Sequence, residues 1–298
     1  MEALSDERVE DYLRYLGVSK PAEPNLDNLD VLVRAHLERA TFENLDVLLE
    51  RHISLDAEIV LSKVTRRGRG GYCFELNSLF GRLLRALGYR VQPRAARLRL
   101  TTPDDSPKRT RLSHMVLSVE LSNGDRYFAD VGMALVGLHR ALPVQGDASP
   151  FRVIHSSEPT GSIDVAVPTS SGGWKIFYTV EPYNLDWLDF VPLNWYSSTN
   201  PDSAMRRMLL VGRRSTADGS WLRLMNDRFV RWSPSDGIVE KRVMRDEDDI
   251  LQLLQTEFGL RLNAADEVAS LRIRLRSLLD KLRMSENLLN RKLVWPEV

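Results

Sequence analysis

The chain has 298 residues and a mass of 34.0 kDa, which is long for a single domain and suits two or three domains that share surfaces. Its 41 basic and 41 acidic residues cancel, so no net charge attracts nucleic acid or a membrane surface. The single cysteine excludes an internal disulfide and a cysteine-rich zinc site, and it suits a reducing compartment.

The first residues are acidic and lack the basic start and apolar run of a secretory signal. No stretch approaches the ~20 apolar residues that a membrane span needs. We therefore expect a cytoplasmic protein with no nucleic-acid partner, no membrane partner and no bound metal. The sequence leaves the oligomeric state open.

Helical patterns dominate the first ninety residues. Ser5 is a suitable N-cap for a helix that Gly17 ends, and a second helix is expected over 29–40, with His36 as a hydrogen-bonded packing residue on its apolar face. A third helix begins at the Gly70-Gly71 turn, where apolar residues recur at helical spacing. This stripe consists of Leu76, Leu79, Phe80, Leu83, Leu84 and Leu87. We assign it to core packing, which gives the start of the helix a rigid support.

From Tyr89 to about Trp195 the apolar period changes to two, which indicates antiparallel β-structure. Strands are expected over 90–94, 114–121, 126–131, 163–167 and 174–180, with turns over 101–107, 123–124 and 170–173.

The last hundred residues mix both types of pattern. Further strands are expected over 203–211, 220–225 and 228–232, and helices over 246–258 and 264–294. The final helix is charge-rich and amphipathic, so it either docks onto its own chain or binds a partner. We favour docking.

Cys73 follows a glycine-rich turn, in the segment Arg69-Gly70-Gly71-Tyr72-Cys73-Phe74-Glu75, where a helical pattern begins. Glycines allow a tight turn, and the free N–H groups of a helix N-terminus favour a thiolate over a thiol. An isolated cysteine is more often a buried core residue. The turn and the helix start favour the reactive alternative, so we predict that Cys73 is a nucleophile.

A cysteine nucleophile needs a base close in space and usually a third group that orients the base. Among the five histidines, His114 opens an expected strand, and the hairpin returns through Asp130. Asp130 lies in an apolar run, and a buried aspartate needs a partner. The residues thus suggest a triad of Cys73, His114 and Asp130.

The hairpin between His114 and Asp130 tests this triad. A two-residue Asn123-Gly124 turn, which the dipeptide alone favours, places the two side chains on opposite faces. A three-residue loop over 122–124, with Gly124 left-handed, pairs Val116 with Asp130 and puts His114 on the same face as its diagonal neighbour. The triad requires this longer loop or a bulge elsewhere in the hairpin.

Several segments in this order resemble the arylamine N-acetyltransferase family. They are the Arg69–Glu75 segment, Ser113-His114-Met115 and Phe128-Ala129-Asp130-Val131-Gly132. Ala40-Thr41-Phe42-Glu43-Asn44-Leu45 and the stretch 194–203 are also similar to segments of that family. The match in length, order and spacing covers about residues 1–260.

The resemblance implies an α+β fold. An N-terminal helical bundle over 1–90 carries the nucleophile, and a central antiparallel β-barrel over 91–200 carries His114 and Asp130. A C-terminal α/β lid with an extended C-terminal helix covers 201–298.

The resemblance also implies an enzyme that moves an acyl group from acetyl-CoA or malonyl-CoA to an aromatic amine or hydrazine. The order is ping-pong through an acyl-cysteine, and the catalytic residues are Cys73, His114 and Asp130. The acyl-CoA is a co-substrate, and no permanently bound cofactor is implied.

Glu43 and Arg69 match an acid and an arginine that the family carries near its nucleophile. We expect them to form a buried ion pair that supports the turn, rather than a surface pair worth little. Ser113, Met133 and Phe42 are the implied substrate-binding residues. The family commonly has an aromatic residue where this chain has Met133, so the acceptor preference cannot be carried over.

Thr110 matches a coenzyme-contacting threonine of the family, and Arg206 and Arg207 stand where the family often has small hydroxyl residues. An arginine pair usually lies on a solvated face, but arginine also binds phosphates and carboxylates in bidentate fashion. We assign Thr110, Arg206 and Arg207 to coenzyme binding. We also expect Arg206 or Arg207 to favour a malonyl donor through its free carboxylate.

Two other functions are compatible with the sequence. A papain-like or transglutaminase-like cysteine hydrolase uses the same triad on peptides or amides. A non-catalytic binding protein would use the charged C-terminal helix and have an unreactive Cys73. A cleft that holds a coenzyme favours acyl transfer, whereas an open peptide groove favours hydrolysis.

Overall fold

The computed structural model describes residues 2–99, 110–133, 138–146, 148–155, 161–169, 172–233 and 235–286. The turn expected over 101–107, part of the one expected over 170–173, and the last helix beyond Glu286 lie outside these residues. Within them, no helix combines the length and the apolar character that crossing a membrane requires.

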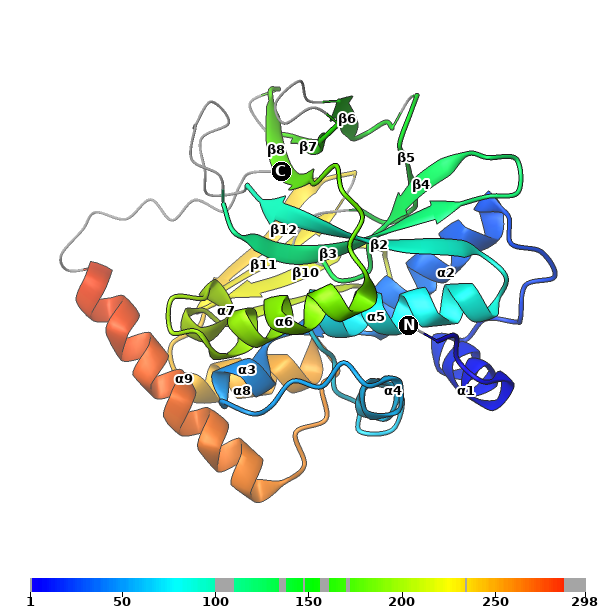
Figure 1. The fold of residues 1–298 in the computed structure, drawn as a ribbon. Helices are drawn as coiled ribbons and strands as arrows, with labels where there is room; N and C mark the ends of the chain where they lie inside the picture. Colours follow the sequence, from blue (N-terminus) through cyan, green and yellow to red (C-terminus); the bar gives the residue numbers. More distant parts are fainter. Residues whose placement is uncertain are drawn as a thin grey trace.

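Helices build the first part of the chain, as the sequence predicts (Figure 1). The first of them ends at Gly17, which has a left-handed φ of 73°, and the second is capped by the Asn25 side chain, which accepts a hydrogen bond from Asn28 N. The short third and fourth helices were not predicted. The helices are α1 (Asp6–Leu16), α2 (Leu26–Arg39), α3 (Leu45–Leu48), α4 (Ala57–Thr65) and α5 (Cys73–Ala86).

A seven-stranded antiparallel sheet follows and curls into a nearly closed barrel with the strand order β5-β4-β3-β2-β8-β7-β6. The five strands expected in this region are confirmed, and the short β5 and β6 were not predicted. The strands are β2 (Arg90–Leu98), β3 (Leu112–Glu120), β4 (Arg126–Ala129), β5 (Leu142–Pro143), β6 (Arg152–His155), β7 (Ile163–Pro168) and β8 (Trp174–Val180).

The hairpin between β3 and β4 has the register that the triad hypothesis requires. Leu117 pairs with Ala129 and Glu120 with Arg126, which leaves residues 122–124 in the loop. Gly124 is left-handed, with a φ of 87°, and its N–H donates to Leu121 O. The three-residue loop is therefore confirmed, and the two-residue turn that Asn-Gly alone favours is wrong.

The expected β-pattern up to about Trp195 is wrong at its end. The segment forms a 3₁₀ turn, η1 (Trp187–Asp189), and then helix α6 (Phe190–Thr199). Local helix signals override the β-forming residues here: Asp186 accepts a hydrogen bond from Leu188 N, and Pro192 lies in the first turn, where its missing N–H costs nothing.

The strand expected over 203–211 is also wrong in its first half. Ser203 Oγ accepts a hydrogen bond from Met205 N and starts the short helix α7 (Ala204–Arg207), so the strand β9 begins only at Leu210. The strands expected over 220–225 and 228–232 are confirmed as β10 (Trp221–Met225) and β11 (Arg228–Ser233).

A five-stranded sheet with the order β1-β9-β10-β11-β12 forms the lid. Its edge strand β1 comes from the helical part of the chain, where Phe42 pairs with Gly212 and Glu43 with Val211. The remaining lid elements are β1 (Phe42–Glu43), β9 (Leu210–Arg214), β10 (Trp221–Met225), β11 (Arg228–Ser233), β12 (Gly237–Val243), α8 (Glu247–Thr256) and α9 (Ala265–Glu286).

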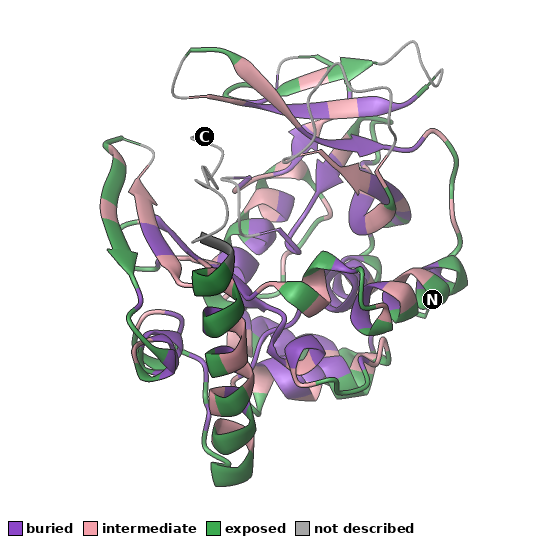
Figure 2. Cartoon of the chain, turned by 90° about the vertical axis from the view of Figure 1, so that its left-hand side faces the viewer, coloured by how far each residue is buried: buried purple, intermediate pink, exposed green. Residues whose placement is uncertain are grey.

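Helix α9 docks onto its own chain, as we expected from its amphipathic pattern (Figure 2). Leu271, Leu275 and Leu279 are buried in a core that they share with α8 and the lid sheet. Its opposite face is exposed, with Ile273 at 72%. Two further cores lie inside the barrel and around α5.

Candidate active site

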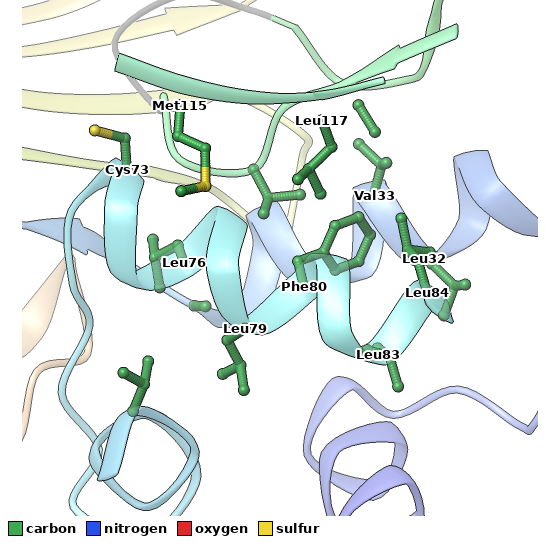
Figure 3. Packing of buried hydrophobic residues seen from close by; sticks show 14 of the residues in the cluster. Leu32, Val33, Cys73, Leu76, Leu79, Phe80, Leu83, Leu84, Met115 and Leu117 are labelled. Carbon is green, nitrogen blue, oxygen red and sulfur yellow. The ribbon is translucent and has the colours of Figure 1, made fainter. Parts of the chain in front are cut away.

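Cys73 is the first residue of α5, which positions it against the barrel strand β3. Figure 3 shows Cys73 at the helix end, with Met115 and Leu117 lying over the same helix. Cys73 is 4% exposed, and its Sγ lies 3.7 Å from the carbonyl oxygen of Ser113. The helix start therefore holds the sulfur at the junction between the helical part and the barrel.

The glycines before Cys73 are required for close approach rather than for an unusual φ. A Cβ atom on Gly70 would lie 1.7 Å from Thr41 O, so only glycine allows the turn to pack against the neighbouring strand. Gly71 forms a β-bridge with Phe42, which ties the nucleophile's turn to the edge of the lid sheet.

His114 and Asp130 form a buried pair beside Cys73. His114 Nε2 lies 2.7 Å from Asp130 Oδ2, and the side chains of the two residues are 0% and 2% exposed. Burial alone lowers the pKa of His114, but the Asp130 carboxylate and the adjacent Cys73 raise it to about 10. The ring is therefore protonated at neutral pH. Its Nδ1 is also buried and makes no hydrogen bond within the described part of the chain.

Asn77 and Gly132 hold the Asp130 carboxylate in place. Asp130 Oδ1 accepts hydrogen bonds from Asn77 Nδ2 at 2.9 Å and from Gly132 N at 3.0 Å. Asn77 also donates to Met115 O at 2.6 Å and accepts from Val131 N at 2.9 Å. A Cβ on Gly132 would lie 2.6 Å from the Cys73 Cα, so this glycine allows the aspartate loop to approach the nucleophile.

A network of ion pairs lies on the other side of the glycine turn. Arg69 Nη2 contacts Glu43 Oε1 at 2.9 Å, with side-chain exposures of 6% and 0%, so the expected ion pair is buried. Lys63 Nζ contacts Glu75 Oε1 at 2.8 Å and Asp46 Oδ2 at 2.7 Å. Burial raises the pKa of Asp46, but Lys63 and Arg69 together bring it down to about 2.

The three residues predicted to bind substrate do not lie in a single cluster. Phe42 is buried in the core around α5, Met133 is buried in the barrel core, and Ser113 precedes the histidine on β3. Thr110 O accepts a hydrogen bond from Arg97, and Thr110 Oγ1 is buried without a hydrogen-bond partner in the described residues.

Arg206 and Arg207 lie on the short helix α7. Arg206 Nη2 contacts Glu50 Oε1 at 2.8 Å, and Arg207 Nη2 donates to the Asp202 carbonyl oxygen at 3.1 Å. Both line a cavity between α7 and α9.

Sequence reasoning missed several residues of this site. Asn77 had a signal, because it follows Cys73 by one helical turn and lies on the same face of α5. Lys63 and Asp46 had none, because their pairing depends on how α3, α4 and α5 pack. The expectation that His36 is hydrogen-bonded is wrong: neither ring nitrogen has a partner in the described residues, and the ring packs against Tyr12 and Phe80. Among the described residues, no three His, Cys, Asp or Glu side chains are grouped so that they could hold a metal ion.

Comparisons with known proteins agree with this geometry. The sequence model of a family described as N-acetyltransferase matches residues 25–268. The arylamine N-acetyltransferase / N-hydroxyarylamine O-acetyltransferase of Salmonella typhimurium is 33% identical over 246 residues, which cover 80% of this chain and 84% of that protein. The N-malonyltransferase FDB2 of Fusarium pseudograminearum is 28% identical over 228 residues, which cover 65% of this chain and 66% of that protein.

Solved structures show the same similarity. The arylamine N-acetyltransferase of Mycobacterium marinum superimposes with a TM-score of 0.82 at 28% identity, covering 91% of this chain and 99% of that one. The structure of the same enzyme in complex with CoA gives a TM-score of 0.81 at 27% identity, with the same coverage. This chain belongs to the arylamine N-acetyltransferase family.

Proposed function

We propose that this protein is an acyl-CoA-dependent arylamine N-acyltransferase in which Cys73 carries the acyl group. The observation that carries the proposal is the buried His114–Asp130 pair, with 2.7 Å between Nε2 and Oδ2, at the start of the helix that bears Cys73. A protonated His114 beside the sulfur stabilises a thiolate, and Asp130 fixes the orientation of the ring.

In the first half-reaction the Cys73 thiolate attacks the thioester carbonyl of the acyl-CoA. A carbon–sulfur bond to Cys73 forms, the carbon–sulfur bond to CoA breaks, and the leaving CoA thiolate takes a proton from His114. Backbone N–H groups at the start of α5 are the donors available to the developing oxyanion.

In the second half-reaction the amine nitrogen attacks the acyl-cysteine. The new carbon–nitrogen bond forms as the bond to Cys73 breaks, and His114 takes the proton that the nitrogen loses. The sulfur returns to a thiolate beside a protonated histidine. Asn77 contributes by holding Asp130, and the Glu43–Arg69 pair by supporting the turn before Cys73.

We assign Thr110, Arg206 and Arg207 to the coenzyme and Phe42, Ser113 and Met133 to the acceptor. Acetyl-CoA is the first candidate donor, because relatives that are 33% and 32% identical to this chain are named acetyltransferases. Malonyl-CoA is the second, because the chain is also similar to an N-malonyltransferase. A free catalytic thiol needs a reducing compartment, so we place the reaction in the cytoplasm.

Intact-protein mass spectrometry after mixing with acetyl-CoA or malonyl-CoA tests the proposal. We expect a mass increase of one acyl group that Cys73→Ala abolishes and that an added aromatic amine removes, with the acylated amine as product. Release of the free acid at the same rate without amine would instead indicate a cysteine hydrolase. The absence of an adduct with either donor would contradict the proposal.

A further inference from the structure

A basic cavity lies between α7 and α9. Both helices contact α3 (Figure 1). Its volume is about 290 Å³. Four cationic side chains line it, two from each helix: Arg206 and Arg207 from α7, and Arg274 and Lys281 from α9. Its lining contains no carboxylate; the other lining residues are Leu48, Ser277, Leu278 and Leu282.

Three of these four cations have no carboxylate partner among the described residues. Arg206 pairs with Glu50, which is 60% exposed. Arg207 donates only to the Asp202 carbonyl oxygen, and Arg274 only to the Arg206 carbonyl oxygen, at 3.1 Å each. Lys281 forms neither a hydrogen bond nor an ion pair with another described side chain.

Other arginines of the same helix are paired, which makes this cavity distinct. Arg272 contacts Asp248, and Arg276 Nε contacts Glu247 Oε1 at 2.8 Å. Gathering several like charges without carboxylates is unfavourable until an anion binds. Arg272 and Arg276 of α9 thus pair with carboxylates of the same chain, whereas Arg274 and Lys281, which line the cavity, have no carboxylate partner among the described residues.

Asn44 links α7, which lines the cavity, to the strand that bridges to the turn before Cys73. Asn44 follows β1, which bridges to Gly71, and its Nδ2 donates to Met205 O at 2.8 Å and to Met208 O at 2.7 Å. These carbonyls lie at the two ends of the Arg206-Arg207 pair. Helix α7, which carries two of the cations, is therefore hydrogen-bonded to the segment that bridges to the turn before Cys73.

We propose that this cavity binds the phosphate groups at the nucleotide end of the acyl-CoA, so that α9 forms part of the donor site. The proposal rests on the acyl-CoA function proposed above. The cavity is too small for a whole coenzyme, because pockets that enclose drug-sized ligands measure about 300–1,000 Å³. It suits the phosphorylated end, which guanidinium and ammonium groups bind by charge-assisted hydrogen bonds.

Charge-removing substitutions on α9 test the proposal. The variants are Arg274→Met, Lys281→Met and the double variant, with Arg272→Met as a control that removes the same charge from the same helix outside the cavity. Calorimetry gives the dissociation constants for CoA and for inorganic pyrophosphate. Kinetics give the ratio of kcat/KM for acetyl-CoA to that for S-acetyl-pantetheine, which carries no nucleotide, and thermal melting checks that each variant is folded.

We expect each single substitution to weaken CoA binding about tenfold, since one charge-assisted hydrogen bond is worth roughly that factor. The donor ratio should fall by a similar factor, and Arg274→Lys should restore part of it. Arg272→Met should stay within about twofold of the parent, as expected for a surface residue.

Unchanged CoA affinity and donor ratio in the double variant would overturn the proposal. Lost pyrophosphate binding with intact CoA binding would also overturn it, because the cavity would then serve a free phosphate compound. Failure of the proposed function gives a different result: the parent protein forms no acyl-enzyme with either donor.

Discussion

A single buried amide, that of Asn77, connects the nucleophile helix to the loop that carries Asp130. Its Nδ2 and Oδ1 bond to Met115 on β3 and to Asp130 and Val131 in the loop after β4. A residue that is 0% exposed and fully hydrogen-bonded has one available geometry. The position of the Asp130 carboxylate relative to His114 thus depends on Asn77. These hydrogen bonds of the Asn77 side chain go to neither Cys73 Sγ nor the His114 ring.

Replacement of this amide should slow the chemistry more than it disturbs the fold. We expect Asn77→Ala to lower the rate of Cys73 acylation by about a hundredfold, because a displacement of ~1 Å at a catalytic group costs that much. The free energy of unfolding should fall by about 2–3 kcal/mol, since Met115 O and Val131 N lose their partner. Stopped-flow acylation with an ester donor and urea unfolding measure the two effects.

Leu79→Ala is the matched control on the same helix. It opens a cavity in the core around α5 and should destabilise by about 2–5 kcal/mol while keeping the acylation rate close to that of the parent. Equal loss of rate in both variants would show that Asn77 acts only through stability.

At the scale of elements, helix α2 buries a titratable group between helices. His36 is 0% exposed, and its ring packs edge-on against Tyr12 of α1 and Phe80 of α5, with centroid distances of 5.9 and 5.3 Å. Burial without a hydrogen-bond partner lowers the pKa of His36 from 6.5 to about 3. The packing of α1, α2 and α5 therefore requires a neutral ring.

This packing should make the protein sensitive to acid. The unfolded chain binds a proton at His36 below about pH 6.5 and the folded chain does not, so the stability lost to this group starts there and grows as the pH falls towards 3. The loss is about 1.4 kcal/mol per pH unit, or about 2 kcal/mol at pH 5. Urea unfolding of the parent and of His36→Leu at pH 7 and pH 5 measures the difference.

The exposed His52 provides the control, because His52→Gln should leave the pH dependence of unfolding unchanged. His36→Leu should reduce it by the amount given above. If the parent and His36→Leu lose the same stability between pH 7 and pH 5, the buried histidine does not couple folding to pH.

Elements whose signals are local could be predicted from the sequence, and elements defined by distant partners could not. The stripe on α5 and the strands of the β3–β4 hairpin follow from periodicity alone. The loop length did not follow from the sequence, because Asn123-Gly124 favours two residues whereas the triad requires three. Helix α6 was missed because the prediction followed its β-forming residues and did not weigh the helix signals of Asp186 and Pro192.

The edge strand β1 could not be predicted, because it is only two residues long and its partners Val211 and Gly212 lie far along the chain. The same reason applies to Lys63 and Asp46. Their side chains would be ordinary surface charges on isolated helices, and only the packing of those helices buries them. Long-range pairing of this kind leaves no pattern in a single sequence.

At the scale of the whole molecule, an ion pair connects the lid to the turn before Cys73, in addition to strand β1. Arg69, four residues before Cys73, contacts Glu267 on α9, which is 198 residues away in sequence. Glu267 also contacts Arg51 Nη1 at 2.8 Å and is 12% exposed. The first turn of α9 therefore lies directly behind the segment that positions the thiol.

Neutralising this carboxylate should loosen both the lid and the turn. Glu267→Gln keeps the shape of the side chain but removes one carboxylate partner of Arg69. The remaining partners of Arg69 are Glu43 and Asp46, at 2.9 and 3.6 Å. Because the pair is mostly buried, we expect the free energy of unfolding to fall by about 1–3 kcal/mol. Acylation of Cys73 should slow by about threefold to tenfold, since Arg69 then holds the turn less tightly.

Urea unfolding and the rate of acyl-enzyme formation measure these two effects, with Asp266→Asn as the control. Asp266 precedes Glu267 on the same helix, but its side chain is exposed, so its neutralisation should change stability by less than about 0.5 kcal/mol and leave the rate unchanged. A Glu267→Gln protein with the stability of the parent but slow acylation would place the effect in the turn alone. Parental values for both quantities would show that α9 contributes nothing to the nucleophile's support, and that Glu43 and Asp46 hold Arg69 without it.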